Sequence, residues 1–363
     1  MSIAPTKTKR CTLADVARTA QVSRSSAFAA LNETHGTNIG ISEERRQHVL
    51  RVAEELGYVR NDLARSLVSG KSKMIGILVP SLTTQFFSGF FTAFDDACYA
   101  SGYTVFVTSS EFNKEREARN LQAFLSRGMD AVVVACGQLE DHAELLEQLR
   151  SQGVAVLMLG TVDTPGVDYM AAGFDEAGVG SLTARQLHDH GHRHVLYFGA
   201  DEASDNSARI HAIRRAHFAT AWQRCGNRLL HLRSDDPLHG GQTVAAWLAE
   251  QPRAEWPTAV VCATDMLALS VISALNMQGI HIPGDLSVTG CDDIPLAPLA
   301  SVPLTTVRLP TDLLAREVWR LLVAGMAEPP AARPPFRVMI APEWIERASV
   351  ASVPRPAATL SPV

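Results

Sequence analysis

The side chains best placed for chemistry lie in residues 12–32, which read TLADVARTAQVSRSSAFAALN. Two short helical patterns meet there at a tight break. Thr12 can cap the first and form a capping box with Asp15, and Ser23 can cap the second. Short, alanine-rich helices pack closely at a steep angle, the geometry of a helix-turn-helix whose second helix enters the DNA major groove. An ordinary hairpin of a small helical bundle is the alternative. The apolar residues on one face of each pattern are Leu13, Val16, Ala17, Ala20, Ala27, Ala30 and Leu31.

Other groupings of reactive side chains are weaker candidates. His188, His190, His192 and His194 form H-D-H-G-H-R-H, at a predicted helix end and strand start. Alternate residues face apart there, so we interpret them as surface and capping histidines rather than metal ligands. The segment GVG at 178–180 lacks the third glycine of a dinucleotide fingerprint. The chain has no P-loop, no G-x-S-x-G and no nucleophile placed beside a base, so we expect no metal, no cofactor and no enzymatic activity.

Charge is unevenly distributed over the 363 residues, whose net charge is -5. Residues 1–73 hold 12 Lys and Arg against 7 Asp and Glu, a net +5. The remainder holds 21 against 31, a net -10. This pattern is typical of a protein in which only the N-terminal part contacts a polyanion.

The composition indicates a globular protein in a reducing, cytoplasmic compartment. The first residues, MSIAPTKTKR, lack the apolar segment of a signal peptide. No apolar run approaches the roughly 18 residues that a membrane span needs. The cysteines form no C-x-x-C pair and predict neither a disulfide framework nor a zinc site. They are Cys11, Cys98, Cys136, Cys225, Cys262 and Cys291.

Two further elements follow the helix pair. A third helix is expected over 42–56, where Ser42 is the cap and Gly57 ends the helix. Residues expected to close the small core are Val49, Val52, Ala53 and Leu56. Residues 61–70 read NDLARSLVSG, a capped pattern of barely two turns. A helix this short is marginal in water, so we expect it to form only when something holds it.

From residue 74 onward, short apolar runs alternate with amphipathic stretches. Apolar strands separated by helices predict parallel sheets covered on both faces, with ligands at the carboxyl ends of the strands. The length favours two α/β lobes, and the last residues, ASVPRPAATLSPV, are typical of a frayed tail. Strands are expected at 74–80, 103–109, 130–136, 154–160, 194–200, 258–264 and 286–291. Helices are expected at 87–101, 115–127, 141–152, 177–190, 210–225 and 266–278.

The order of these parts resembles the lactose-repressor (LacI/GalR) family of bacterial transcription regulators. The resemblance runs through TLADVARTAQVSRSSAFAALN, LGYVRNDLARSL, IGILVPSLTTQFF, GHRHVLYFGA, DMLALS, DLSVTGCDDIPLA and PLTTVRLP. The phrases VPSLTTQFF and GFD…GHRHVLYFGA look closest to the gluconate-repressor branch. The family implies an α plus α/β fold: a helix-turn-helix head, a hinge helix, and two doubly wound parallel-sheet lobes of periplasmic-binding-protein type.

The expected division of the chain follows from this resemblance. The head is expected at 1–60 and the hinge helix with its linker at 61–73. The effector and dimerisation unit is expected at 74–350, followed by a flexible tail at 351–363. Within that unit, the first lobe is expected at about 74–188 and 308–335, and the second at about 189–307 and 336–350.

The resemblance assigns DNA-contacting residues in the head and hinge. Arg24 matches a base-reading position and can donate to guanine O6 and N7, while Ala29 offers only apolar contact. Leu67 matches the hinge leucine that family members wedge into the minor groove. Phe28 stands where the family usually has a small polar residue, and Gln21 replaces the usual turn glycine. The full expected set is Thr12, Ser23, Arg24, Ser25, Ser26, Ala29, Asn61, Ala64 and Leu67.

The resemblance also assigns effector-binding residues: Phe87, Asp175, Arg214, Thr264 and Asp292. An aspartate that accepts from hydroxyls and an arginine that grips a carboxylate suit a sugar or sugar acid. Departures from the family pattern are His217 for a glycine, Thr264 for an asparagine, and Leu309 at a position that is often polar; Arg215 could replace Arg214.

We therefore expect a ligand-responsive, DNA-binding repressor that acts as a homodimer on palindromic double-stranded operator DNA, with a gluconate-like effector favoured. Corepression, in which the effector strengthens DNA binding instead of releasing it, would use the same mechanism. A cytoplasmic ligand-binding module or enzyme with an unrelated helical head is the alternative, and it predicts no salt-dependent binding to duplex DNA.

Overall fold

The computed structural model describes residues 11–31, 41–59, 70–83, 86–135, 139–160, 169–200, 206–234, 236–329 and 336–353. The chain forms two compact units, Met1–Ser72 and Lys73–Val363. Asn61, Ala64 and Leu67, and with them the expected hinge helix, lie outside the described residues.

The first unit contains three helices, α1 (Leu13–Thr19), α2 (Arg24–Leu31) and α3 (Glu43–Glu55). The predicted capping box is confirmed: Asp15 N donates to Thr12 Oγ1 over 3.3 Å, and Thr12 N donates to Asp15 Oδ2 over 3.0 Å. Ser23 caps α2 as expected, because Ser26 N donates to Ser23 Oγ over 3.0 Å. The capped ends satisfy amide groups that the first turn of a helix leaves without partners.

The core of this unit agrees with the sequence except at one residue. Leu56 was expected to close the core, but it is the C-cap of α3 and is 38% exposed. Tyr58, which follows Gly57, packs partly against the core instead. The turn between α1 and α2 places Gln21 at a φ of 53°. This left-handed conformation explains why a glycine is usual there.

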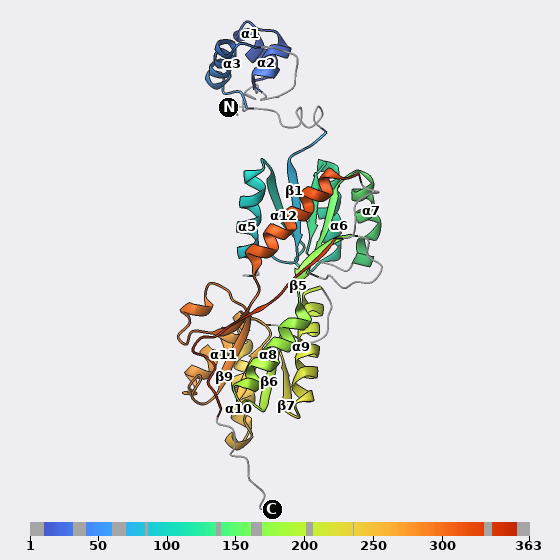
Figure 1. Cartoon of the computed structure of the whole chain (residues 1–363). Helices are drawn as coiled ribbons and strands as arrows, with labels where there is room; N and C mark the ends of the chain where they lie inside the picture. Colours follow the sequence, from blue (N-terminus) through green and yellow to red (C-terminus); the bar gives the residue numbers. More distant parts are fainter. Residues whose placement is uncertain are drawn as a thin grey trace, which may run out of the picture. The chain divides into compact units, whose positions relative to one another are not determined.

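The second unit has two six-stranded sheets with helices on both faces (Figure 1), which confirms the predicted fold class. In the first sheet all strands are parallel. In spatial order they are β11 (Arg337–Ile340), β5 (Met170–Phe174), β4 (Ala155–Leu159), β3 (Ala131–Val134), β1 (Met74–Val79) and β2 (Thr104–Ser109). One face is covered by α5 (Phe86–Ala100) and α12 (Thr311–Ala327), and the other by α6 (Lys114–Arg127) and α7 (Ala143–Ser151).

The second sheet is parallel except for its edge strand β12. In spatial order its strands are β12 (Glu343–Ile345), β10 (Thr305–Arg308), β9 (Ser287–Asp292), β8 (Ala259–Cys262), β6 (His194–Gly199) and β7 (Arg228–Arg233). Its helices are α8 (Glu176–Asp189), α9 (Asn206–Arg224), α10 (Gly240–Glu250) and α11 (Asp265–Met277). Short 3-10 turns lie at Leu139–His142, Arg253–Glu255 and Ala297–Leu299.

The chain passes between the lobes three times: from β5 to α8, from β10 to α12, and from β11 to β12. These passages correct the expected lobe boundaries. Residues 337–340, expected in the second lobe, form β11 and pair with β5 in the first sheet. Most of α8, expected in the first lobe, packs on α9 and contributes Ala184 and Leu187 to the second-lobe core.

The beginning of the expected tail is also corrected. Ala351 N donates to Ser287 Oγ over 3.1 Å. Val353 N donates to His190 O over 2.8 Å. Residues 351–353 are therefore attached to the second lobe, and residues 354–363 lie outside the described part of the chain.

Close packing of α8 on α9 positions the part of the second lobe that faces the first. A Cβ added to Gly180 on α8 would collide with the carbonyl oxygen of Arg214 and lie 2.7 Å from the Phe218 amide nitrogen. Both atoms belong to the backbone of α9 and cannot rotate away. The absence of a side chain at Gly180 therefore sets the separation of the two helices.

We predict that Gly180→Ala lowers the free energy of unfolding by about 2 kcal/mol, because the helices must separate. Gly284→Ala is the matched control, since a Cβ there comes no closer than 3.7 Å to another atom. Its effect should stay within about 0.5 kcal/mol. Urea unfolding followed by circular dichroism measures both variants, and equal midpoints would contradict the argument.

Candidate functional site

The exposed side of α2 carries the residues that the sequence assigned to DNA. Arg24 and Ser25 are exposed, whereas Ser26 and Ala29 are half-buried. The Ser23 and Ser26 hydroxyl groups lie 2.8 Å apart and hydrogen-bond to each other. The N-terminal turn of α2 thus presents one guanidinium and a set of hydroxyl groups to solvent.

A cavity lies between the two lobes at the carboxyl ends of their strands, where open α/β sheets bind ligands. Its volume is about 810 Å³, including its open mouth. Four of the five predicted effector residues line it, namely Phe87, Arg214, Thr264 and Asp292. The other lining residues are Pro80, Phe112, Ala135, Leu159, Gly160, Gly173, Phe174, Glu176, Ile210, His211 and Leu314.

Asp175 is the predicted effector residue that the structure places elsewhere. Its Oδ1 accepts from Gly178 N over 2.8 Å, so it is the N-cap of α8 rather than part of the cavity wall. The next residue, Glu176, faces the cavity instead. Asp175 and Glu176 are neighbours in the sequence. The position at which α8 begins decides that Asp175 caps the helix and that Glu176 faces the cavity.

Arg214 is the charged centre of the cavity wall. It forms a buried ion pair with Glu176, and its Nη1 lies 3.8 Å from Asp292 Oδ1 and 3.4 Å from Cys291 Sγ. Burial works against the charged guanidinium. The Cys291 thiol and the Glu176 and Asp292 carboxyl groups nevertheless raise the pKa of Arg214 well above its ordinary value. Arg214 therefore stays protonated. Its positive charge is already balanced by Glu176 before any ligand binds.

Asp292 has a different electrostatic environment. Burial raises the pKa of Asp292 well above its usual range; Arg214 opposes this shift, and Asp265 and Glu176 add to it. The backbone of Asp292 is also unusual, with a φ of 122°. The oxygen atoms of this carboxyl group can accept hydrogen bonds from a hydroxyl group of a ligand.

An ion network beside Asp292 connects the cavity to two passages between the lobes. Asp293 accepts from Arg308 Nε over 2.8 Å and from Arg347 Nη2 over 2.6 Å. Arg308 ends β10, just before the chain enters the first lobe. Glu343, just after the return from β11, lies 3.4 Å from Arg308 Nη1. The residues bound by Asp293 thus lie beside the points where the chain passes between the lobes.

Of the residues that depart from the family pattern, only Thr264 lines the cavity. Thr264 caps α11, because its Oγ1 accepts from Leu267 N over 3.3 Å. Leu309 is buried in the first-lobe core and His217 is exposed, so neither lines the cavity. Arg215 lies 3.3 Å from His231 Nδ1 and does not take the place of Arg214.

Sequence reasoning missed several residues of the cavity, above all Phe112, Phe174, Glu176 and His211. Burial and the nearby Arg214 lower the pKa of His211 to about 3, so its imidazole is neutral near pH 7. Phe174 could have been found from the GFD turn. Phe112 and His211 lie in irregular or weakly amphipathic stretches, where periodicity carries no signal.

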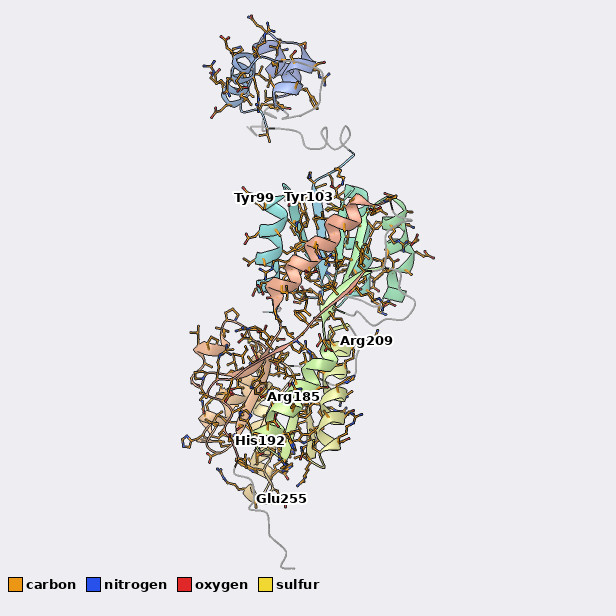
Figure 2. All side chains as sticks on the ribbon, in the orientation of Figure 1. Tyr99, Tyr103, Arg185, His192, Arg209 and Glu255 are labelled. Atoms are coloured by element: carbon orange, nitrogen blue, oxygen red, sulfur yellow. The ribbon has the colours of Figure 1, made fainter. Side chains whose placement is uncertain are left out.

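The histidines at 188–194 do not form a metal site. Within the described part of the chain, no group of His, Cys, Asp and Glu is arranged to hold a metal ion. His190 Nδ1 lies 2.8 Å from the Gln186 carbonyl, as expected for a histidine near a helix end. The expectation that His192 lies at the surface was wrong. His192 lies in the second lobe (Figure 2), where it is fully buried, and its Nδ1 is 2.8 Å from Thr258 Oγ1.

Comparisons with known proteins agree with this architecture. Residues 184–350 match the model of the periplasmic binding protein-like domain. The chain is 27% identical over 346 residues to the HTH-type transcriptional repressor PurR of Aliivibrio fischeri (strain MJ11), covering 93% of this chain and 98% of that protein. The PurR of Pasteurella multocida (strain Pm70) is 29% identical over 349 residues, covering 94% and 99%. Over nearly its whole length the chain is therefore similar to these PurR repressors.

Solved structures show the LacI fold over the same range. The lac repressor dimer bound to operator and the anti-inducer ONPF has a TM-score of 0.81 at 22% identity, covering 94% of this chain and 100% of that one. A LacI family regulator from Lactobacillus casei with bound glucose has a TM-score of 0.65 at 26% identity, covering 76% and 99%. The PurR proteins named above are transcriptional repressors, the class of protein that the sequence predicted. The narrower resemblance to the gluconate-repressor branch has no support among them.

No helix among the described residues has both the length and the apolar character needed to cross a membrane.

The burial of His192 predicts a pH dependence of stability. Burial, and then the charge of His190, lower the pKa of His192 to about 4 from 6.5. Between these values the unfolded chain binds a proton that the folded chain excludes, so stability falls as the pH falls. Between pH 7 and pH 5 the loss due to His192 should be about 2 kcal/mol.

Urea unfolding of His192→Gln at pH 7 and pH 5 should show a smaller loss than the natural chain. His217→Gln is the control, because His217 is exposed, and it should retain the full pH dependence. An unchanged dependence in His192→Gln would rule out this residue as the cause.

Proposed function

We propose that this protein is a transcriptional repressor whose hold on operator DNA is set by a small molecule in the cavity between its lobes. The observation that carries the proposal is the combination, in one chain, of a capped helix-turn-helix and a cavity between two lobes with a charged centre. Its similarity to PurR repressors over 93% of its length supports the same function.

In this proposal α2 lies in the major groove. Arg24 reads a guanine through its two donor groups, and the hydroxyl groups of Ser23, Ser25 and Ser26 contact phosphates or base edges. The helix dipole adds favourable charge where the first turn of α2 meets a phosphate. The positive charge of residues 1–73 makes this binding dependent on salt.

We propose a homodimer, which lets two heads occupy the halves of a palindromic site. The second lobe exposes large apolar side chains around α11: Met277 is 87% exposed, Leu299 is 77% exposed and Leu296 is 47% exposed. Met277 lines a shallow groove together with Leu269 and Ile272, and Ala300, which follows Leu299, lines it as well. An exposed apolar patch of this kind supports self-association.

For the effector we propose a sugar or a related hydroxylated molecule. Gluconate, favoured on motif resemblance, would compete with Glu176 for Arg214 and would approach Asp292. The charges around the cavity therefore favour a neutral member of this class over a sugar acid. Gluconate and neutral sugars compared side by side distinguish the two.

Effector binding would shift the population between lobe orientations, and the connector to the heads would transmit the change. Operator and effector must alter each other's affinity by the same factor. Release and corepression differ only in which orientation the effector prefers.

The function is tested by gel retardation with the DNA upstream of the protein's own gene, at two salt concentrations, with and without gluconate or neutral sugars. We predict salt-dependent retardation that a ligand of this class changes. Arg24→Ala should weaken binding by about 10-fold to 100-fold, since a bidentate base contact is lost. Arg51→Ala removes the same charge from the exposed side of α3 and should have a much smaller effect. A protein that never retards this DNA is not the proposed repressor.

Leu67→Ala tests the connector, which lies outside the described residues. If Leu67 is wedged into the minor groove, as the family resemblance implies, the variant should lose most of its operator affinity because the bend is no longer supported. Calorimetric titration with the ligand should be unchanged. Operator affinity equal to that of the natural chain would refute the wedge.

A further inference from the structure

The outer side of α2 carries an aromatic ring that does not belong to the core of the head. Ala27, Ala30 and Leu31 are buried and define the inner side of the helix, whereas Phe28 is half-buried. In the described part of the head, the half-buried apolar side chains that pack on the core are Cys11, Leu13, Val22, Ile41, Leu50 and Tyr58. Because Phe28 is not one of them, the core of the head does not account for a phenylalanine at this position.

Helix geometry places this ring between the residues assigned to base contacts. Successive residues of an α-helix are about 100° apart around the helix axis. Phe28 therefore lies about 40° from Arg24 and about 60° from Ser25, between the two. Ala29 continues the same side of the helix, whereas Ser26 lies on the far flank, where its hydroxyl group hydrogen-bonds to that of the helix cap over 2.8 Å. In the proposed function α2 lies in the major groove, so Phe28 lies within the surface that faces the base pairs.

The composition of α2 limits the base edges that this helix can read. Its sequence is RSSAFAAL, which has no Asn or Gln for a bidentate contact with adenine and no Asp or Glu to accept from cytosine. Arg24 can donate to guanine, and serine contacts either kind of base pair. Phe28 and Ala29 offer an apolar surface, and the apolar group of a base pair in the major groove is the C5 methyl group of thymine. Apart from its serines, α2 can therefore recognise an A·T pair only by its thymine methyl group.

We infer that Phe28 is a specificity-determining residue of the head, and that its ring contacts a thymine C5 methyl group in each half of the operator. This inference rests on the proposed function, in which α2 lies in the major groove. Arg24 and Phe28 are four residues apart, which is about 6 Å along the helix axis. Base pairs are about 3.4 Å apart along the duplex. The thymine should therefore lie within about two base pairs of the guanine that Arg24 contacts.

The test begins with the identification of the operator. The full-length protein selects binding sites from random-sequence duplexes, and gel retardation measures their affinities. We expect each half of the selected sequence to contain a guanine and, within about two base pairs of it, a thymine. Replacing that thymidine with deoxyuridine removes only the methyl group and keeps the pairing with adenine. The natural chain should lose about 4-fold in affinity for each half-site changed, as the burial of one methyl group provides.

Phe28→Ala assigns this contact to one side chain. Alanine is the best helix former, so α2 should be retained. The affinities of this variant for the thymine and uracil duplexes should differ by less than about 2-fold, because the ring is no longer present to cover the methyl group. Leu56→Ala is the matched control, since Leu56 is an apolar residue of the same unit and is 38% exposed at the end of α3. It should keep the full difference between the two duplexes.

Three results would overturn the inference: a selected sequence without a thymine near the guanine, equal affinity of the natural chain for the thymine and uracil duplexes, or a full difference in Phe28→Ala. Circular dichroism checks that the variants are folded, and Phe28→Ser replaces Phe28→Ala if the latter does not fold. Failure of the proposed function would look different, because no duplex would then be selected or retarded.

Discussion

The structure of the effector unit depends on the burial of one charge, the guanidinium of Arg214. A charge in this position is tolerated only with acidic side chains at close range, and these come from separate elements: Glu176 at the start of α8, which forms the ion pair, and Asp292 at the end of β9. The same pairing requires α8 and α9 to approach closely, which Gly180 permits. The electrostatic requirement of one side chain thus determines how the polar wall of the cavity is assembled.

The polar wall of the cavity lies beside the passages between the lobes. Asp292 is followed directly by Asp293, which binds Arg308 and Arg347 beside two of the passages between the lobes. In the proposed function, a ligand that contacts Asp292 would act on a segment that lies beside these passages. Such a linked segment is what a two-state switch needs, because a ligand shifts an equilibrium only through contacts that differ between its states.

The two lobes contribute different residues to the cavity. Among the described residues, the charged and polar side chains of the lining come from α8 and the second lobe, and Phe87, Leu159 and Phe174 of the lining belong to the first-lobe core. The head is a separate compact unit with its own small core, and its helix ends are capped internally.

Much of this protein was determined by the sequence alone, since the signals are local. The caps at Thr12 and Ser23, the central strands and the helices between them follow from hydrogen-bonding side chains and apolar periodicity. Weaker local signals were missed, such as β5, whose MAAGF has little of the β-branched content typical of strands. The tertiary structure alone decided that Asp175 caps a helix while Glu176 faces Arg214, that His192 is buried, and that β11 and β12 belong to different sheets. These outcomes depend on contacts between residues that are distant in the sequence. Local sequence patterns carry no information about such contacts.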